Sequence, residues 1–232
     1  MLVFAQTTLE PIVRPAYQWA SDWMLPVFLF TLVAIAYTRK NYPFRIQRLW
    51  TSTWNIRALR QAIREEPNTP RANLLFNINH ALLMGLFLYL TLSIWAVPFG
   101  GIPPFVVYLI CIGGVLAAYF IKQLIINIVK FLGDGDFGLT EYTYNVNLIN
   151  RVIGLFLFPT LTLFVYMPKN QAFIYWYVAI TIVGCMLLYR IMRGIINALQ
   201  VNVPLFYIFF YICTLEILPW VVCARLIWTA HS

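Results

Sequence analysis

Apolar runs long enough to cross a lipid bilayer recur along this chain, and they constrain its fold more than any other feature. A helix of about 20 apolar residues spans a hydrocarbon core about 30 Å thick, and the runs have about 17–27 residues. The runs predict six membrane-spanning helices, at about residues 22–38, 74–97, 105–131, 148–166, 172–189 and 204–227. We therefore expect an all-α protein, a polytopic transmembrane helical bundle formed by a single domain over residues 1–232.

The composition agrees with burial in lipid. The chain is 62% hydrophobic and 10% charged, whereas a soluble domain is about half apolar and about a quarter charged. All four cysteines lie in apolar runs without a CxxC pair, which favours small buried side chains over disulfides or metal ligands. The sequence has only two histidines, His80 and His231, so neither haem nor zinc is expected. No cofactor is predicted.

Lys and Arg are concentrated on one predicted side of the bundle. The positive-inside rule makes that side cytoplasmic, so both termini are expected in the periplasm. The first 20 residues lack a basic stretch before an apolar one, so no cleavable signal peptide is expected. The bias also accounts for the net charge of +8, and nucleic-acid binding is not predicted. The cytoplasmic side holds 13 of the 16 basic residues: Arg39, Lys40, Arg45, Arg48, Arg57, Arg60, Arg64, Arg71, Lys122, Lys130, Arg151, Arg190 and Arg193.

The cytoplasmic segment of about residues 39–73 is the only long polar one. Its run "RIQRLWTSTWNIRALRQAIREE" (residues 45–66) predicts an interfacial amphipathic helix that lies on the membrane surface. Two interpretations remain open: an orienting helix that contacts anionic lipid headgroups, which we favour, and a docking platform for a cytoplasmic protein partner. The basic stripe and the two indoles expected at headgroup depth are Arg57, Arg60, Arg64, Trp50 and Trp54.

Polar side chains near the ends of the apolar runs are candidate functional or structural residues. The acidic segment that includes Glu141 lacks the ligand spacing of an EF-hand, which favours a link followed by a helix start. For Asn145 and Asn150, hydrogen bonding between helices is favoured over ligand binding. His80 lies one to two turns inside the second predicted span. In the third span, the pairs Gly113 with Ala117 and Gly114 with Ala118 suggest close helix packing.

One carboxylate interrupts the last apolar run. In "YICTLEILPW", Glu216 comes 12 residues after Pro204, which is about 18 Å along a helix and near the bilayer centre. A charge there costs at least about 2.5 kcal/mol, so the side chain is expected to face the bundle interior. Pro219 removes the backbone hydrogen bond to the Leu215 carbonyl, one turn earlier, and can kink this helix. Two roles stay open: a protonated, hydrogen-bonded lock between helices, which we favour, and a proton carrier.

Three stretches resemble a known family. They are "STWNIRALRQAIREEPNTPRANLLFNINHALLMGLFLYL", "TEYTYNVNLINRVIGLFLFP" and, most specifically, "YICTLEILP". Together they are similar to an uncharacterised family of small polytopic inner-membrane proteins of Bacteroidota, defined as a domain of unknown function, over about Leu25 to Ile227. The resemblance implies the inner membrane of a Gram-negative cell and supplies no activity. Residues that match the family pattern are Glu65, Glu66, Glu141, Tyr142, Asn145, Asn150, Gly154, Pro159, Tyr211, Glu216 and Pro219.

The function class follows mainly from what the sequence pattern does not contain. It has no recognisable nucleophile–base pair, metal cluster, nucleotide-binding loop or thiol pair, so an enzyme is not the favoured class. We favour a non-catalytic accessory or scaffold subunit of an inner-membrane complex, with a protein partner, in protein export, assembly or envelope biogenesis. The alternative is a small proton-coupled transporter that uses Glu216.

Overall fold

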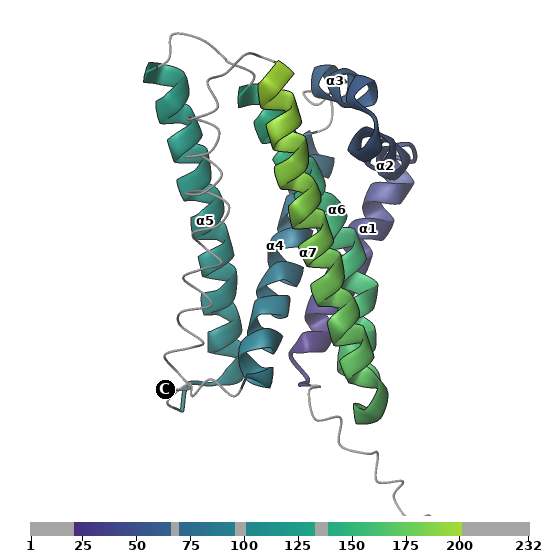
Figure 1. Cartoon of the computed structure of the whole chain (residues 1–232). Coiled ribbons are helices and arrows are strands. Elements are labelled where there is room, and N and C mark those ends of the chain that lie inside the picture. The colour runs from purple at the N-terminus through teal and green to yellow at the C-terminus, as the bar shows by residue number, and fades with distance from the viewer. Residues whose placement is uncertain (1–20, 66–69, 96–100, 133–138, 201–232) are drawn as a thin grey trace, which may run out of the picture.

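The chain is helical wherever the structure describes regular secondary structure. The computed structural model describes residues 21–65, 70–95, 101–132 and 139–200. The all-α prediction is confirmed for these residues, and the predicted span at 204–227, with Glu216, lies outside them. In chain order the helices are α1 (Met24–Asn41), α2 (Arg45–Trp54), α3 (Ile56–Glu65), α4 (Pro70–Ile94), α5 (Pro104–Leu132), α6 (Leu139–Tyr166) and α7 (Lys169–Gln200) (Figure 1).

Four helices in the described part are long and apolar enough to cross a membrane. Their spanning segments are Arg71–Ile94, Pro104–Ile128, Thr143–Tyr166 and Gln171–Ile196. The predicted first span forms α1, which has 18 residues and carries Arg39 and Lys40 in its last turn. Its apolar part is therefore shorter than the roughly 20 residues that span a bilayer. The described residues thus contain four candidate spans, and the predicted number of six is not confirmed.

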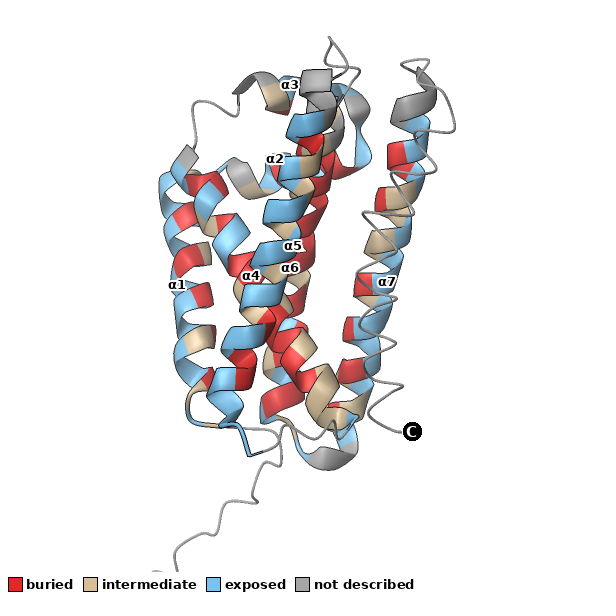
Figure 2. Ribbon diagram, turned by 90° about the vertical axis from the view of Figure 1, so that its left-hand side faces the viewer, coloured by how far each residue is buried: buried red, intermediate tan, exposed pale blue. Residues whose placement is uncertain are grey.

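Two helices form the centre of the bundle. Within an 18-residue apolar stretch of each span, 56% of the residues are buried in α4 and 67% in α6, but only 11% in α5 and 22% in α7. The side chains of Leu83, Leu86 and Leu157 make the centre of this core and are almost fully buried. Helix α4 packs against α1, α5 and α6, and α7 packs on α6. Figure 2 shows that α1 and α7 bury only the side that faces the centre.

One end of the bundle is basic and carries the surface helices. Helices α4 and α6 begin at this end, which we call the basic end, and α1, α5 and α7 finish there (Figure 1). Helix α6 starts nine residues before the predicted span of 148–166, and α7 continues to Gln200, beyond the predicted end at 189. These helices extend beyond the apolar stretches because their extra turns bury polar side chains against neighbours, among them Asn145, Arg190 and Arg193.

The surface segment folds as two helices instead of the single predicted one. The chain between α2 and α3 is extended at Asn55, with φ −120° and ψ 121°. The Asn55 side-chain oxygen accepts a hydrogen bond from the Arg57 backbone N–H at 2.9 Å, which satisfies a free donor at the start of α3. We call residues 45–65 the hairpin. Its apolar face, with Leu49 and Leu59, belongs to the bundle core, so it packs on protein.

The close approaches between helices lie at glycines other than those predicted. A Cβ atom on Gly85 of α4 would come within 3.2 Å of the Ile112 backbone of α5. A Cβ on Gly154 of α6 would lie 3.0 Å from the His80 Cα of α4. Gly113 and Gly114 are exposed, and within the described residues an added Cβ would meet nothing within 4 Å. The packing predicted for these two glycines is therefore absent from that part of the structure.

Candidate functional site: a buried polar cluster beneath the hairpin

Three arginines are buried inside the bundle near its basic end. Arg151 of α6 and Arg190 and Arg193 of α7 are each at most 9% exposed. A buried guanidinium is costly unless its N–H groups find acceptors. All three find amide or carbonyl oxygens on neighbouring helices. The arginines therefore join helices to one another, and they are the main elements of the candidate site.

Arg151 connects the two central helices. Its Nε donates to the Asn77 side-chain oxygen at 2.8 Å, and one terminal nitrogen donates to the Asn73 side-chain oxygen at 3.0 Å. Asn73 and Asn77 are four residues apart on α4, so they lie on one face of that helix. Two parallel bonds to one guanidinium fix the register of α4 against α6, because a shift of either helix would break both.

Arg190 connects the outer helix to the centre. A terminal nitrogen of Arg190 donates to the Asn150 side-chain oxygen at 3.0 Å, and both side chains are buried. Asn150 precedes Arg151 in α6, so consecutive residues of one helix turn bind α7 and α4. The sequence-based expectation that Asn150 hydrogen-bonds between helices agrees with this contact.

Arg193 holds the hairpin against α7. Its terminal nitrogens donate to the backbone carbonyls of Ser52, at 2.9 Å, and Thr53. The Tyr189 hydroxyl, one turn earlier on α7, also donates to the Thr53 carbonyl. Both carbonyls lie in the last turn of α2, where a helix has free acceptors and a partial negative charge. A cation from α7 thus caps α2 from outside its own segment.

Several buried polar atoms near this cluster have no hydrogen-bond partner in the described part of the chain. They are both amide atoms of Asn79 and of Asn145, Nδ1 of His80 and Nε of Arg193. The His80 ring lies edge-on to Tyr119 of α5, with the ring centroids 5.9 Å apart. Polar atoms buried without partners are uncommon in folded proteins and mark places where water or a ligand could bind.

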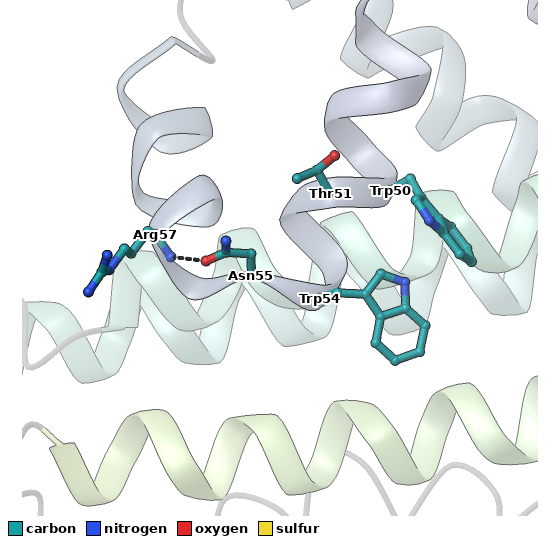
Figure 3. Close-up of a pocket in the computed structure, with 5 residues that line it drawn as sticks. All are labelled: Trp50, Thr51, Trp54, Asn55 and Arg57. Carbon is teal, nitrogen blue, oxygen red and sulfur yellow. Dashed lines mark hydrogen bonds between the residues drawn. The ribbon is translucent and has the colours of Figure 1, made fainter.

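A shallow depression lies at the junction of the hairpin helices. Trp50, Thr51, Trp54, Asn55 and Arg57 line it (Figure 3). The two indoles meet edge to face, with their centroids 5.7 Å apart. Trp50 also contacts Phe156 of α6, and Trp54 contacts Tyr189 of α7. The aromatic rings therefore form a continuous contact from the hairpin to the spanning helices.

The predicted site residues differ in how far the structure buries them. His80, Asn145 and Asn150 are buried, and Glu141 is half-buried in the first turn of α6. Arg57 is exposed on α3. Arg60 and Arg64 also belong to α3, although the structure does not describe their side chains. Glu216 lies outside the described residues.

Sequence reasoning assigned the three buried arginines to membrane orientation only. The spacing of polar residues along their helices would have indicated contacts between helices. Asn73 and Asn77 are four residues apart, and Arg190 and Arg193 are three apart, which places each pair on one helix face. An amide pair and a basic pair of this kind, each at the edge of an apolar run, predict polar contacts between helices.

These features define the class: a helical protein, with four helices in its described residues long and apolar enough to cross a membrane, whose buried polar side chains join its helices and hold a surface hairpin. The chain belongs to the DUF4271 family, a domain of unknown function that matches residues 24–227. The expected membership in a family of unknown function is confirmed. No curated protein and no solved structure matches the chain.

Proposed function

We propose that this protein is a non-catalytic accessory or scaffold subunit of a complex in the inner membrane of a Gram-negative cell, a member of the Bacteroidota. Its role would lie in protein export, assembly or envelope biogenesis. The basic end would face the cytoplasm, as the positive-inside rule requires, and both termini would face the periplasm. The hairpin would present a protein-docking surface on the cytoplasmic side.

The observation that carries this proposal is the contact of Arg193 with the last turn of α2. Hydrogen bonds from α7 to the Ser52 and Thr53 carbonyls make the hairpin a fixed part of the bundle. A segment that only oriented the chain would need basic residues in a short loop and no such attachment. A fixed surface loses less conformational entropy when a partner binds, which favours docking.

The side of the hairpin that faces away from the bundle suits a protein partner. On α2, Gln47 and Thr51 are exposed, whereas Leu49 and Thr53 are buried. Positions two residues apart on a helix point to nearly opposite sides. A second depression lies on this outer side, and its lining includes Phe44, Gln47 and Gln61. Phe44 is 67% exposed, and an aromatic side chain on a polar surface is a common anchor at protein interfaces.

Photo-cross-linking in cells tests the docking surface. A photoreactive residue at Gln47 should give one discrete protein adduct, and the same residue at Ile121 on the exposed face of α5 should give none. The adduct at Gln47 should weaken in a Phe44→Ala background, because the anchor is lost while the fold is kept. Equal labelling at both positions, or no adduct at Gln47, would contradict the proposal.

The alternative, a small proton-coupled transporter that uses Glu216, is supported by a different observation. Asn79, His80 and Asn145 bury polar atoms that have no partner in the described residues. Such atoms could bind water along a proton path. Proton uptake into vesicles that contain the purified protein tests this function. Uptake that disappears in Glu216→Gln would favour transport over scaffolding.

A further inference from the structure

The lateral side of the hairpin carries an exposed aromatic surface. Trp50 and Trp54 are adjacent on one side of α2 and remain 48% and 59% exposed. Their other faces pack on Phe156 and Tyr189, as described above. The rings are therefore held in place while large parts of their surfaces stay uncovered.

The depth of this surface is that of a lipid headgroup region. Trp54 contacts Tyr189, which lies about 30 Å along α7 from Lys169 at the opposite end, at about 1.5 Å per residue. This length matches the thickness of a hydrocarbon core. Tryptophan is enriched at that boundary because its ring is apolar and its N–H is polar.

Donors suited to an anion line the same depression as the rings. Figure 3 shows Arg57 on one side of Asn55 and the two indoles on the other. The Asn55 oxygen is used by the Arg57 backbone N–H, so the amide nitrogen of Asn55 is the group left to donate to a ligand. The exposed Arg57 guanidinium presents a planar set of donors that fits phosphate. The N-terminus of α3 adds partial positive charge at the same place.

From this arrangement we propose that the depression lined by Trp50, Thr51, Trp54, Asn55 and Arg57 binds one anionic phospholipid. The lipid phosphate is held by Arg57 and Asn55, and its glycerol and upper acyl chains lie on the two indoles. A free phosphate ion would gain nothing from the rings, and a neutral lipid would gain less from the guanidinium. The site deepens the proposed function, because it would fix the hairpin at the membrane surface, yet it requires no protein partner.

Binding can be measured on the purified full-length protein. The protein is placed in nanodiscs of phosphatidylcholine with a small fraction of phosphatidylglycerol and then released for native mass spectrometry. The intact protein should retain one phosphatidylglycerol molecule in preference to phosphatidylcholine. Arg57→Gln should weaken this retention by about tenfold or more, because a charge-assisted hydrogen bond is lost.

Matched variants separate this site from general attraction to a basic surface. Arg71→Gln removes the same charge from another exposed arginine at the basic end and should leave retention unchanged. Trp54→Leu should weaken retention although no charge changes. Equal losses in Arg57→Gln and Arg71→Gln, or unchanged retention in Arg57→Gln, would overturn the proposal. A thermal melt of each variant confirms that it is folded.

A competition arm distinguishes a lipid from a free anion. Inorganic phosphate in excess should not displace the retained phosphatidylglycerol, because the indole contacts favour the lipid. Displacement by phosphate alone would overturn the assignment to a lipid. The protein-docking proposal has its own readout, the adduct at Gln47, so failure of the lipid site and failure of the docking surface are seen separately.

Discussion

Arg193 on α7 and Ser52 on α2 are 141 positions apart in the chain, yet the guanidinium of one donates a 2.9 Å hydrogen bond to the backbone carbonyl of the other. The carbonyl belongs to the last turn of α2, which cannot satisfy it within the helix. The contact therefore gives the buried Arg193 guanidinium an acceptor and gives the end of α2 a cap. It makes the position of the hairpin depend on α7.

Replacement of Arg193 tests this dependence. Arg193→Met keeps much of the side-chain volume but leaves the Ser52 and Thr53 carbonyls with fewer donors. Each unsatisfied buried group costs about 1–3 kcal/mol, partly offset because the burial of a charge is also removed. We expect a lower melting temperature and faster amide hydrogen exchange confined largely to residues 45–65.

Arg71→Gln is the control for this experiment, because Arg71 is an exposed arginine at the same end of the bundle. It should change neither melting nor exchange. If Arg193→Met left hairpin exchange as slow as in the parent protein, Arg193 would not be what holds the hairpin.

Gly154 should tolerate a methyl group poorly. In Gly154→Ala the new Cβ would lie 3.0 Å from the Cα of His80 and 3.2 Å from its Cβ. The backbone of α4 would have to move, and this movement would strain the Arg151 contacts with Asn73 and Asn77. Overpacking of this kind typically costs about 1–3 kcal/mol, so melting in detergent should occur at a lower temperature.

Gly113→Ala is the matched comparison for Gly154→Ala. An added Cβ at Gly113 meets nothing within 4 Å in the described structure, and alanine favours helix over glycine. This variant should melt at the same temperature as the parent or higher. Equal destabilisation by the two substitutions would show that Gly154 does not mark a close approach.

The four long helices were predictable because length and hydropathy are local properties. Apolar runs located most of α4, α5, α6 and α7. The ends of α6 and α7 were not predicted, since turns rich in Asn and Arg look like loops until a partner helix is known. Arg151 is one such case: its two acceptors lie more than 70 positions earlier in the chain. No single run of sequence contains that pairing.

The hairpin also has a feature that the sequence alone did not predict. The spacing of its apolar residues predicted helix, and both α2 and α3 are helical. The break at Asn55 depends on a side chain that serves as an N-cap. Asparagine is common at such caps but also occurs inside helices, so its presence alone did not predict the break. The apolar face packs into the bundle core through Leu49 and Leu59. The sequence pattern alone did not show that protein would cover this face.

Chain orientation gives a test that is independent of the hairpin. With the basic end in the cytoplasm, Ser232 is expected in the periplasm if the apolar run 204–227 crosses the membrane. An alkaline phosphatase fused after Ser232 should be active, and a fluorescent protein at the same position should be dark. A bright fluorescent fusion with an inactive phosphatase fusion would reverse the predicted orientation or remove the predicted last span.

The role of Glu216, which lies outside the described residues, can be decided by two substitutions. Our hypothesis is that its carboxyl is protonated and forms a hydrogen bond that locks the last predicted span to a neighbour. Its motivation is the position of one carboxylate in the middle of an apolar run. Glu216→Gln keeps size and hydrogen bonding but cannot carry a proton, so folding and most function should persist. Glu216→Ala should lower stability by about 1–3 kcal/mol, because it leaves the partner unpaired.

Melting in detergent and complementation of a deletion strain, measured together for both variants, separate the lock from the proton carrier. If Glu216 is a hydrogen-bonded lock, the Glu216→Gln protein should resemble the parent in both assays, and the Glu216→Ala protein should melt at a lower temperature. If Glu216 is a proton carrier, the Glu216→Gln protein should melt at the same temperature as the parent. It should lose complementation to the same extent as the Glu216→Ala protein. The two roles differ at Gln because a hydrogen bond needs only a polar group of the right size, whereas proton transfer needs a group that titrates. A folded, inactive Glu216→Gln protein would therefore refute the lock and favour the transporter.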